Sequence, residues 1–278
     1  MKILPDERLT LVFWYYRELF AGPWLECREN YVISYTGILN GGIVQEDPGP
    51  RIGAIVVAAG NSHRMGDVDK ITVPLVGKPV ITYSLDILEQ NPLIGQVVLV
   101  APPLRVNQFK ALMDDFNYFK ISVVAGGSRR QDSVRNGLVA LNDTDWILVH
   151  DGARPFIDQA IIELGLEAVL TTGAATAAVS LKDTIKEADD SGVVIRTLKR
   201  EHFWAVQTPQ VFSTRLLTQA HEEISSDVTD DAAMVEMIGG IVKIFPGSDE
   251  NLKLTTVSDI TFAEAILQQR LLQDMSSN

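Results

Sequence analysis

From residue 51 onward, short runs of consecutive apolar residues alternate with longer segments in which apolar side chains recur every three or four positions. The periodic segments predict helices, such as the one whose face carries Ile81, Leu85 and Leu88. The short runs are too brief for typical buried helices and predict strands at 52–57, 97–100, 121–124, 146–149 and 174–179. Continuously apolar strands alternating with helices are typical of a parallel sheet covered on both faces, so the pattern predicts an α/β fold.

After residue 180 this alternation stops. Segments 181–186 and 193–198 are β-prone and flank a polar turn, which predicts a β-hairpin arm over about 181–198. A lone hairpin is marginal in water, so we expect the arm to pair with its twin across the two-fold axis of a homodimer. A helix opened by 229–231, a strand at 241–245 and a last helix at 258–272 complete the predicted elements.

The first 50 residues are rich in aromatic side chains and end in turn-forming segments, Asn40-Gly41-Gly42 and Asp47-Pro48-Gly49-Pro50. This composition predicts a boundary near Pro50, with an N-terminal extension at 1–50 that is poorly ordered or accessory, and a main domain at 51–275. An amphipathic segment at 9–20 that docks on the main domain or on a partner is the alternative.

Composition narrows the classes of function. The chain has 278 residues, 46% hydrophobic and 22% charged, and its formal charge of −12 argues against a general nucleic-acid surface. Its one cysteine, Cys27, and the lack of zinc-ligand spacing make thiol and zinc chemistry unexpected. No apolar run approaches the length of a membrane span, and no secretory or transit signal is evident, so we expect a cytoplasmic protein without a membrane partner.

Three polar clusters, at 58–70, 126–133 and 150–155, follow predicted strands at their carboxyl ends, where parallel sheets bind ligands. The first begins with small residues that let a ligand approach the backbone and continues with Arg64 and Lys70. Backbone amides on a glycine-containing turn together with Arg and Lys suit a polyphosphate. The loop has neither the spacing of a P-loop nor a dinucleotide fingerprint, so a Walker ATPase and an NAD enzyme are both disfavoured.

Seven motifs, in order along residues 51–275, together resemble one family, the 2-C-methyl-D-erythritol 4-phosphate cytidylyltransferases of the non-mevalonate isoprenoid pathway. They are AAGNSHRM followed by Lys70, GGSRRQDSVRNGL (126–138), VHDGARPF (149–156), KDTIK (182–186), QTPQVF (207–212), TDDA (229–232) and ENLKLTT (250–256). The resemblance implies a doubly wound, mostly parallel, Rossmann-like nucleotidyltransferase fold with the hairpin as dimerisation arm. It also implies transfer of CMP from CTP to methylerythritol phosphate, with release of pyrophosphate.

The resemblance also implies residue roles, position by position. Arg64 and Lys70 match the family's triphosphate-binding pair, and Asp151 matches a nucleotide-site aspartate associated with Mg²⁺, which Mn²⁺ or another divalent cation could replace. The positions that match the cytidine pocket are Ala58, Ala59, Gly60, Gly127 and Ser133. Those that match the sugar-phosphate site are Arg154, Thr184, Arg200 and Lys253, with Thr184 supplied across the dimer. The implied catalytic residues are Arg64, Lys70, Arg200 and Lys253.

The chemistry explains why such a site needs cations. A phosphate monoester must attack the α-phosphorus of a polyanionic nucleotide, so repulsion is an obvious part of the barrier, and no general base is required because the nucleophile is already ionised. Transfer of CMP to ribitol 5-phosphate is an alternative, because the CTP motifs would look alike. A non-catalytic nucleotide-binding regulator is another, although it would need neither acceptor cations nor a metal carboxylate.

Several polar residues also have simpler interpretations. Arg129 and Arg130 are both compatible with solvated charges. Asp230 and Asp231 are expected at a helix N-terminus, where carboxylates complement the helix dipole, rather than at a metal. His150 is expected to be a buried histidine whose ring nitrogens are hydrogen-bonded.

Overall fold

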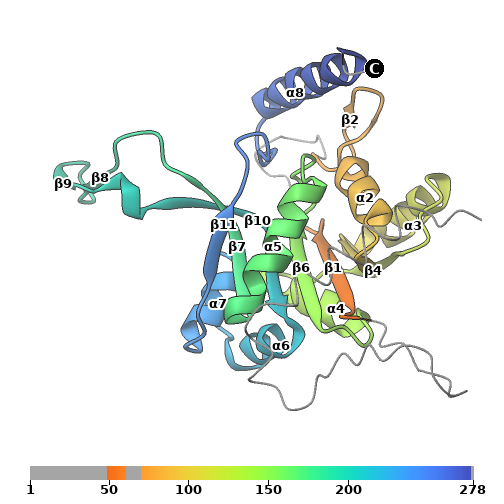
Figure 1. Ribbon diagram of the computed structural model, residues 1–278, viewed down its shortest axis with the longest axis horizontal. Coiled ribbons are helices and arrows are strands. Elements are labelled where there is room, and N and C mark those ends of the chain that lie inside the picture. The colour runs from red at the N-terminus through yellow and green to blue at the C-terminus, as the bar shows by residue number, and fades with distance from the viewer. Residues whose placement is uncertain (1–48, 61–69, 277–278) are drawn as a thin grey trace, which may run out of the picture. The chain divides into compact units, whose positions relative to one another are not determined.

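The computed structural model describes residues 49–60 and 70–276, and all structural statements below concern these residues (Figure 1). The chain from Pro50 to Asn278 separates as one compact unit. The segment 9–20, the loop residue Arg64 and the terminal residues 277–278 lie outside the described residues. The division of the chain into an extension and a main domain therefore stays a prediction.

A seven-stranded sheet with the order β11-β7-β10-β6-β1-β4-β5 organises this unit. Its strands are β1 (Ile52–Val57), β4 (Ile94–Ala101), β5 (Ile121–Ala125), β6 (Trp146–Asp151), β7 (Ala174–Ser180), β10 (Trp204–Ser213) and β11 (Lys243–Pro246). All neighbours in the sheet are parallel except β10, which runs antiparallel to both β6 and β7. The predicted α/β fold with a mostly parallel sheet is confirmed.

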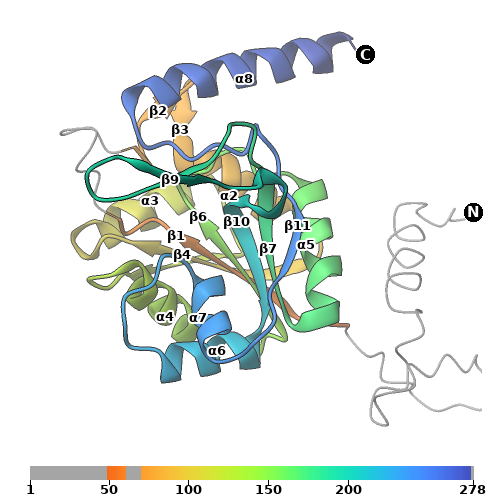
Figure 2. The ribbon, with the colours of Figure 1, turned by 90° about the vertical axis from the view of Figure 1, so that its left-hand side faces the viewer.

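Helices cover both faces of the sheet because alternate residues of its strands are buried on opposite sides (Figures 1 and 2). On one face Ala54 and Val56 pack with α2 (Val80–Gln90), α3 (Val106–Asp115) and α5 (Gln159–Thr172). On the other face Ile55 packs with α4 (Arg130–Ala140), α6 (Thr214–Glu223) and α7 (Asp231–Met237). This double coverage explains why β1 and residues 97–100 of β4 are apolar without interruption.

A third, smaller cluster lies beside the carboxyl end of the sheet. The short strands β2 (Pro74–Leu75) and β3 (Lys78–Pro79) pair with each other, and α8 (Val257–Ser276) lies over them (Figure 2). Leu75, Phe156 and Leu254 are buried between these segments. The cluster anchors the chain on both sides of Lys253. Leu254 is buried in it, and Leu252 is partly buried against it.

Local signals set most helix ends. Asp158 caps α5 by accepting a hydrogen bond from the Ile161 amide at 2.8 Å, and Gly173 ends the helix in a left-handed conformation at φ 79°. Asp230 caps α7 by accepting from the Ala233 amide, as the interpretation of 229–231 predicted. Among the described residues, no helix has both the length and the apolar character that crossing a bilayer requires. The cytoplasmic location stays a prediction.

The structure differs from the sequence-based expectation in two places. Strand β10 and helix α6 were not predicted. The pattern of β10 is broken by buried Gln207, Thr208 and Gln210 and by a cis Thr208–Pro209 peptide at a register shift, and proline within a run argues against a sheet strand. The hairpin is also shorter than predicted, because its strands are only β8 (Lys186–Ala188) and β9 (Val194–Thr197).

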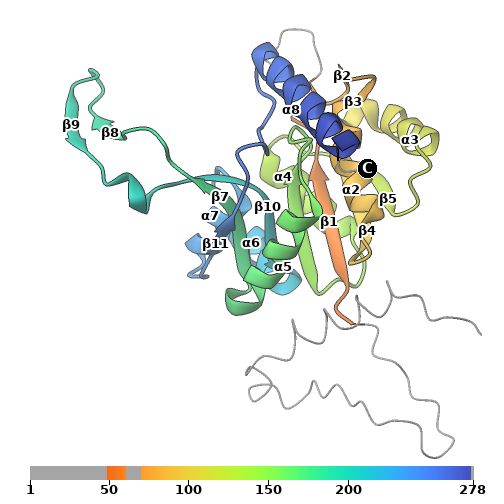
Figure 3. The ribbon, with the colours of Figure 1, turned by 45° about the horizontal axis from the view of Figure 1, so that its top comes forward.

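The hairpin projects away from the sheet between β7 and β10 (Figures 1 and 3). Its turn is formed by Asp189, whose side chain accepts hydrogen bonds from the amides of Ser191 and Val193, with Gly192 at φ 84°. Val193, Val194 and Ile195 are 62%, 54% and 60% exposed. Three large apolar side chains in succession are thus left uncovered on this arm.

Candidate active site

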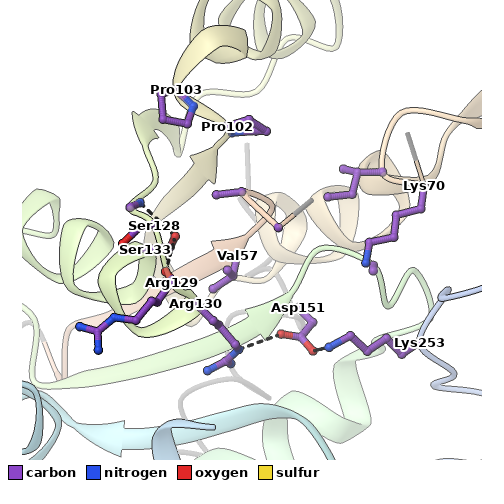
Figure 4. Close-up of a pocket in the computed structure, with 15 residues that line it drawn as sticks. Val57, Lys70, Pro102, Pro103, Ser128, Arg129, Arg130, Ser133, Asp151 and Lys253 are labelled. Atoms are coloured by element: carbon purple, nitrogen blue, oxygen red, sulfur yellow. Dashed lines mark hydrogen bonds and ion pairs between the residues drawn. The ribbon is translucent and has the colours of Figure 1, made fainter. Parts of the chain in front are cut away.

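A pocket of about 330 Å³ lies at the carboxyl ends of β1, β4, β5 and β6, where the sequence predicted a ligand site (Figure 4). Its lining includes Val57 at the end of β1, Pro102 and Pro103 after β4, and Ser128 after β5. The predicted site residues in the lining are Ala59, Gly60, Lys70, Gly127, Ser133, Asp151 and Lys253. Ala58, which is 1% exposed, and Arg154 are not among the lining residues. Residues more than a hundred positions apart are thus brought to one cavity.

Two adjacent glycines allow close packing around the second polar cluster. A Cβ atom on Gly126 would lie 2.3 Å from the Cβ of Ala59 in the first cluster, and one on Gly127 would lie 2.4 Å from the Cβ of Asp132 in its own cluster. A side chain at position 126 would therefore force the two loops apart, and one at position 127 would distort the second loop. The hydroxyl of Ser133 accepts a hydrogen bond from the Gly127 amide and donates one to the Arg129 carbonyl, each at 3.1 Å, so it also fixes this loop.

Asp151 forms the charged centre of the pocket (Figure 4). Its Oδ2 accepts a hydrogen bond from the Lys253 ammonium at 2.7 Å, and its Oδ1 lies 3.4 Å from Nε of Arg130. Nε of Arg154 lies 3.9 Å from Oδ2. The Asp151 side chain is 11% exposed, so one nearly buried carboxylate is shared by three cations.

This arrangement keeps Asp151 ionised. Burial by itself would raise the pKa of Asp151, but the charges of Arg130, Lys253 and Arg154 outweigh it and hold the pKa well below its usual value. Burial lowers the pKa of Arg154, and Asp151 opposes that effect. The ionised carboxylate therefore attracts all three cations.

The unpredicted strand β10 holds the end of β6 in place. The Thr208 hydroxyl accepts a hydrogen bond from the Asp151 amide at 3.0 Å and lies 3.1 Å from Nδ1 of His150. Nε2 of His150 lies 2.9 Å from the Arg154 carbonyl oxygen. Both ring nitrogens of this fully buried histidine are thus engaged, as expected, and burial lowers its pKa to about 4.

The same strand positions the loop that carries Lys253. The side-chain amide of Gln207 donates to the Ser248 carbonyl at 2.9 Å, and the Asn251 side chain donates to the Thr208 carbonyl at 2.7 Å. The Asn251 carbonyl in turn accepts a hydrogen bond from Nη1 of Arg154 at 2.7 Å. Asn251 and Gln207 were not predicted as site residues. Their backbone-directed contacts leave no signal in sequence spacing.

Arg130 and Asp231 are the charged pair that sequence reasoning missed. Arg130 is not a solvated charge: its side chain is 25% exposed, and Nη1 donates to Oδ2 of Asp231 at 2.6 Å. Asp231 is at the first position of α7, as expected, but its carboxylate is completely buried against Arg130. The sequence did offer one signal that Arg130 belongs to the site: it is the first residue of a helix that follows Gly126 and Gly127. Arg129 instead pairs with Asp132 and Asp227.

Two predicted residues lie elsewhere. Thr184 and Arg200 are exposed on the segments that lead into and out of the hairpin, and they are absent from the pocket lining of this chain. Nη1 of Arg200 donates to the Lys182 carbonyl, which ties the two segments together. Arg64 lies outside the described residues.

The donor set restricts what kind of metal could bind. Within 49–60 and 70–276, no group of three or more His, Cys, Asp or Glu side chains is arranged to hold a metal ion. Asp151 is the carboxylate in the described pocket lining. Mg²⁺ is commonly held by one or two carboxylates together with substrate phosphates, so this site fits Mg²⁺ that arrives with a phosphorylated ligand.

The pocket is suited to a polyanion. Lys70, Arg130 and Lys253 all line it, against one lining carboxylate. Two unit charges 4 Å apart interact by about 4 kcal/mol at an effective dielectric constant of 20, so a few fixed cations can offset much of the repulsion between two phosphate groups. Gly60 and Gly127 also line the pocket, and the lack of a side chain at these positions lets a ligand approach the backbone.

Comparison with known proteins shows which family this chain is similar to. Residues 52–269 match the family model described as 2-C-methyl-D-erythritol 4-phosphate cytidylyltransferase. A protein of that name from Dehalococcoides mccartyi is 45% identical over 220 residues, which cover 79% of this chain and 97% of that protein. One from Pelotomaculum thermopropionicum is 43% identical over 227 residues, covering 79% and 95%.

Solved structures agree. The 4-diphosphocytidyl-2C-methyl-D-erythritol synthase of Anaerococcus prevotii superposes with a TM-score of 0.72 at 30% identity, covering 79% of this chain and 99% of that one. The 2-C-methyl-D-erythritol 4-phosphate cytidylyltransferase of Thermus thermophilus superposes with a TM-score of 0.64 at 28% identity, covering 77% and 98%. The family match begins at residue 52, the first residue of β1.

Proposed function

This chain belongs to the 2-C-methyl-D-erythritol 4-phosphate cytidylyltransferase family, and from that membership we propose how its pocket carries out the reaction. It is a nucleotidyltransferase that uses CTP and a sugar-alcohol phosphate. A phosphate oxygen of 2-C-methyl-D-erythritol 4-phosphate attacks the α-phosphorus of CTP, the bond to the β-phosphate breaks, and pyrophosphate leaves. The product is 4-diphosphocytidyl-2-C-methyl-D-erythritol.

The proposed division of labour follows from where the cations stand. Lys70, with Arg64 from the neighbouring loop sequence, holds the triphosphate, and the backbone around Ala59, Gly60 and Gly127 receives the cytidine. Lys253 and Arg154, which both approach Oδ2 of Asp151, hold the acceptor phosphate. Catalysis consists of positioning and charge stabilisation, because the nucleophile is already an anion.

Asp151 would hold the divalent cation, Mg²⁺ by preference, through its carboxylate, with nucleotide phosphates completing the coordination. When bound, the cation neutralises charge that builds on the departing pyrophosphate. Lys253 and Arg130 also contact this carboxylate.

We further propose that the enzyme is a homodimer whose arms complete the acceptor sites. Thr184 and Arg200 are exposed on the arm, and Val193, Val194 and Ile195 leave an apolar surface there. Pairing of two arms would bury this surface and would carry Thr184 to the pocket of the partner.

One observation carries the proposal: Lys70, Arg130 and Lys253 gather around a single ionised carboxylate at the carboxyl edge of the sheet. The test is pyrophosphate release with CTP and Mg²⁺, using methylerythritol phosphate and ribitol 5-phosphate as alternative acceptors. We expect methylerythritol phosphate to be preferred. A preference for ribitol 5-phosphate of more than about tenfold in kcat/KM, or about 1.4 kcal/mol, would overturn the acceptor assignment. CTP binding without pyrophosphate release with either acceptor would favour a non-catalytic regulator.

A further inference from the structure

Arg130 lies between two carboxylates that differ in their access to the pocket. It is 3.4 Å from Asp151, which lines the pocket, and 2.6 Å from Asp231, whose side chain has no exposed surface (Figure 4 shows the Asp151 side of this contact). The shorter contact is thus made to the carboxylate that no ligand can reach. Burial by itself would lower the pKa of Arg130, but the charges of Asp231 and Asp151 raise it, so the guanidinium remains charged.

Asp231 is fixed in the protein interior. Its Oδ1 lies 3.2 Å from Nε2 of His221 on α6. The start of α7 is held by Gln210 of β10, which donates to Asp230 at 2.7 Å and accepts from the Ala232 amide at 3.2 Å. Asp231 therefore cannot follow Arg130 toward a ligand, and it acts as a fixed anchor.

Because Arg130 contacts two carboxylates, it keeps Asp231 as a partner when a metal ion binds to Asp151. A divalent cation and a guanidinium compete for the same oxygens of Asp151. If Asp151 were the only partner of Arg130, metal binding would leave a partly buried guanidinium unpaired, which is costly. Asp231 removes that cost, because Arg130 remains paired after Asp151 is taken.

We propose that Asp231 is a positioning residue for metal-nucleotide binding: it keeps Arg130 at the pocket wall and allows Asp151 to exchange Arg130 for a divalent cation. This rests on the proposed metal role of Asp151. After the exchange, Arg130 stays beside the pocket with N–H groups available to nucleotide phosphates. Arg130 and Lys253 both contact the Asp151 carboxylate in the structure.

The test measures binding rather than turnover. CTP affinity is determined by isothermal titration calorimetry at Mg²⁺ concentrations from zero, in EDTA, to saturation, and the half-saturating Mg²⁺ concentration is compared between variants. In Asp231→Asn, Arg130 loses its alternative charged partner and competes more strongly for Asp151. We expect the half-saturating concentration to rise by at least about threefold, because hydrogen bonds between charged groups are stronger than neutral ones.

A double variant tests whether Asp231 acts through Arg130. Arg130→Gln alone would leave the Asp231 charge buried with only His221 beside it, so it could fail to fold. The pair Arg130→Gln with Asp231→Asn removes both charges together. Since the competing guanidinium is gone, its half-saturating Mg²⁺ concentration should return to the wild-type value or fall below it.

Asp227→Asn is the matched control. Asp227 pairs with Arg129, the neighbouring arginine, and its side chain is 84% exposed, so this variant should have the wild-type Mg²⁺ dependence. Thermal unfolding is recorded for every variant, because a purely structural role for Asp231 would lower Tm without moving the Mg²⁺ midpoint.

The outcomes separate the two proposals. Asp151→Asn should lose most of the Mg²⁺ dependence. If it does not, the metal assignment of Asp151 fails, and the inference about Asp231 fails with it. If Asp151→Asn behaves as expected but Asp231→Asn has an unchanged midpoint, the role of Asp231 is overturned while the proposed function stands. A double variant that needs more Mg²⁺ than wild type would also overturn the role of Asp231. This double variant still provides the test if Asp231→Asn alone does not fold.

Discussion

The predicted acceptor-binding residues lie in two regions whose surroundings differ. In the pocket, Arg154 and Lys253 are held by Asp151 and by the carbonyl of Asn251. On and beside the arm, Thr184 and Arg200 are exposed, and Nη1 of Arg200 donates to the Lys182 carbonyl. The pocket residues are therefore held in place by contacts within their own chain. The residues predicted on the arm are exposed to solvent in this chain. This difference is expected if, as proposed, the site is shared between two subunits.

The pocket side of this comparison can be tested by removing one cation. Lys253→Ala should lower kcat by about 10²- to 10³-fold, because a fixed charge directed at the reacting phosphates is lost. Lys243→Ala, an exposed lysine on β11, is the control and should leave kcat unchanged. Steady-state pyrophosphate release gives both values. An equal, small loss in the two variants would mean that Lys253 is a surface charge.

The arm side can be tested by mixing two inactive proteins. If Thr184 acts in the partner's pocket while Lys70 acts in its own, mixing Lys70→Ala with Thr184→Ala should restore about a quarter of wild-type activity. Half of the dimers would be mixed, and one of the two sites in each would be whole. Subunit exchange is verified with differently tagged chains. Activity that stays at the level of the parents after exchange would place Thr184 and Lys70 in the same subunit's site.

The burial of His150 beside the pocket also predicts a pH effect on the free energy of unfolding. His150 is completely buried with a pKa of about 4, so below its unfolded value near 6.5 the unfolded chain binds more protons than the folded one. Stability should therefore fall as pH drops from about 6.5 toward 4, by about 2 kcal/mol between pH 7 and pH 5. Urea unfolding at the two pH values measures it.

The control for this effect comes from the arm. His150→Gln should remove that part of the pH dependence, whereas His202→Gln should retain it, because the His202 side chain is 73% exposed. If both variants kept the full dependence, burial of His150 would not be its source.

The smallest effect is expected outside both regions. Because the family match begins at residue 52, deletion of residues 1–49 should leave kcat and Tm nearly unchanged. Activity assays, thermal unfolding and sedimentation measure the consequences. A loss of several degrees in Tm, or of dimerisation, would show that the segment 9–20 packs on the rest of the chain.

The sequence by itself determined the sheet and the place of the pocket. Buried strand segments such as 52–57 and 97–100 are apolar throughout because helices cover both their faces, and this is a local signal. Polar clusters at strand ends followed from the same pattern, so Lys70 and Asp151 were expected together although 81 positions separate them. The resemblance added the roles of individual residues.

Only the tertiary structure decided how that pocket is held. Strand β10 was missed because its inward polar residues, Gln207 and Thr208, bond to a loop and a strand end that are remote in sequence. Arg130 and Asp231 are 101 positions apart, and neither has a local pattern that distinguishes a buried pair from a solvated charge and a helix cap. Apolar burial is written into sequence periodicity, whereas the partner of a buried polar group depends on which segments the fold brings together.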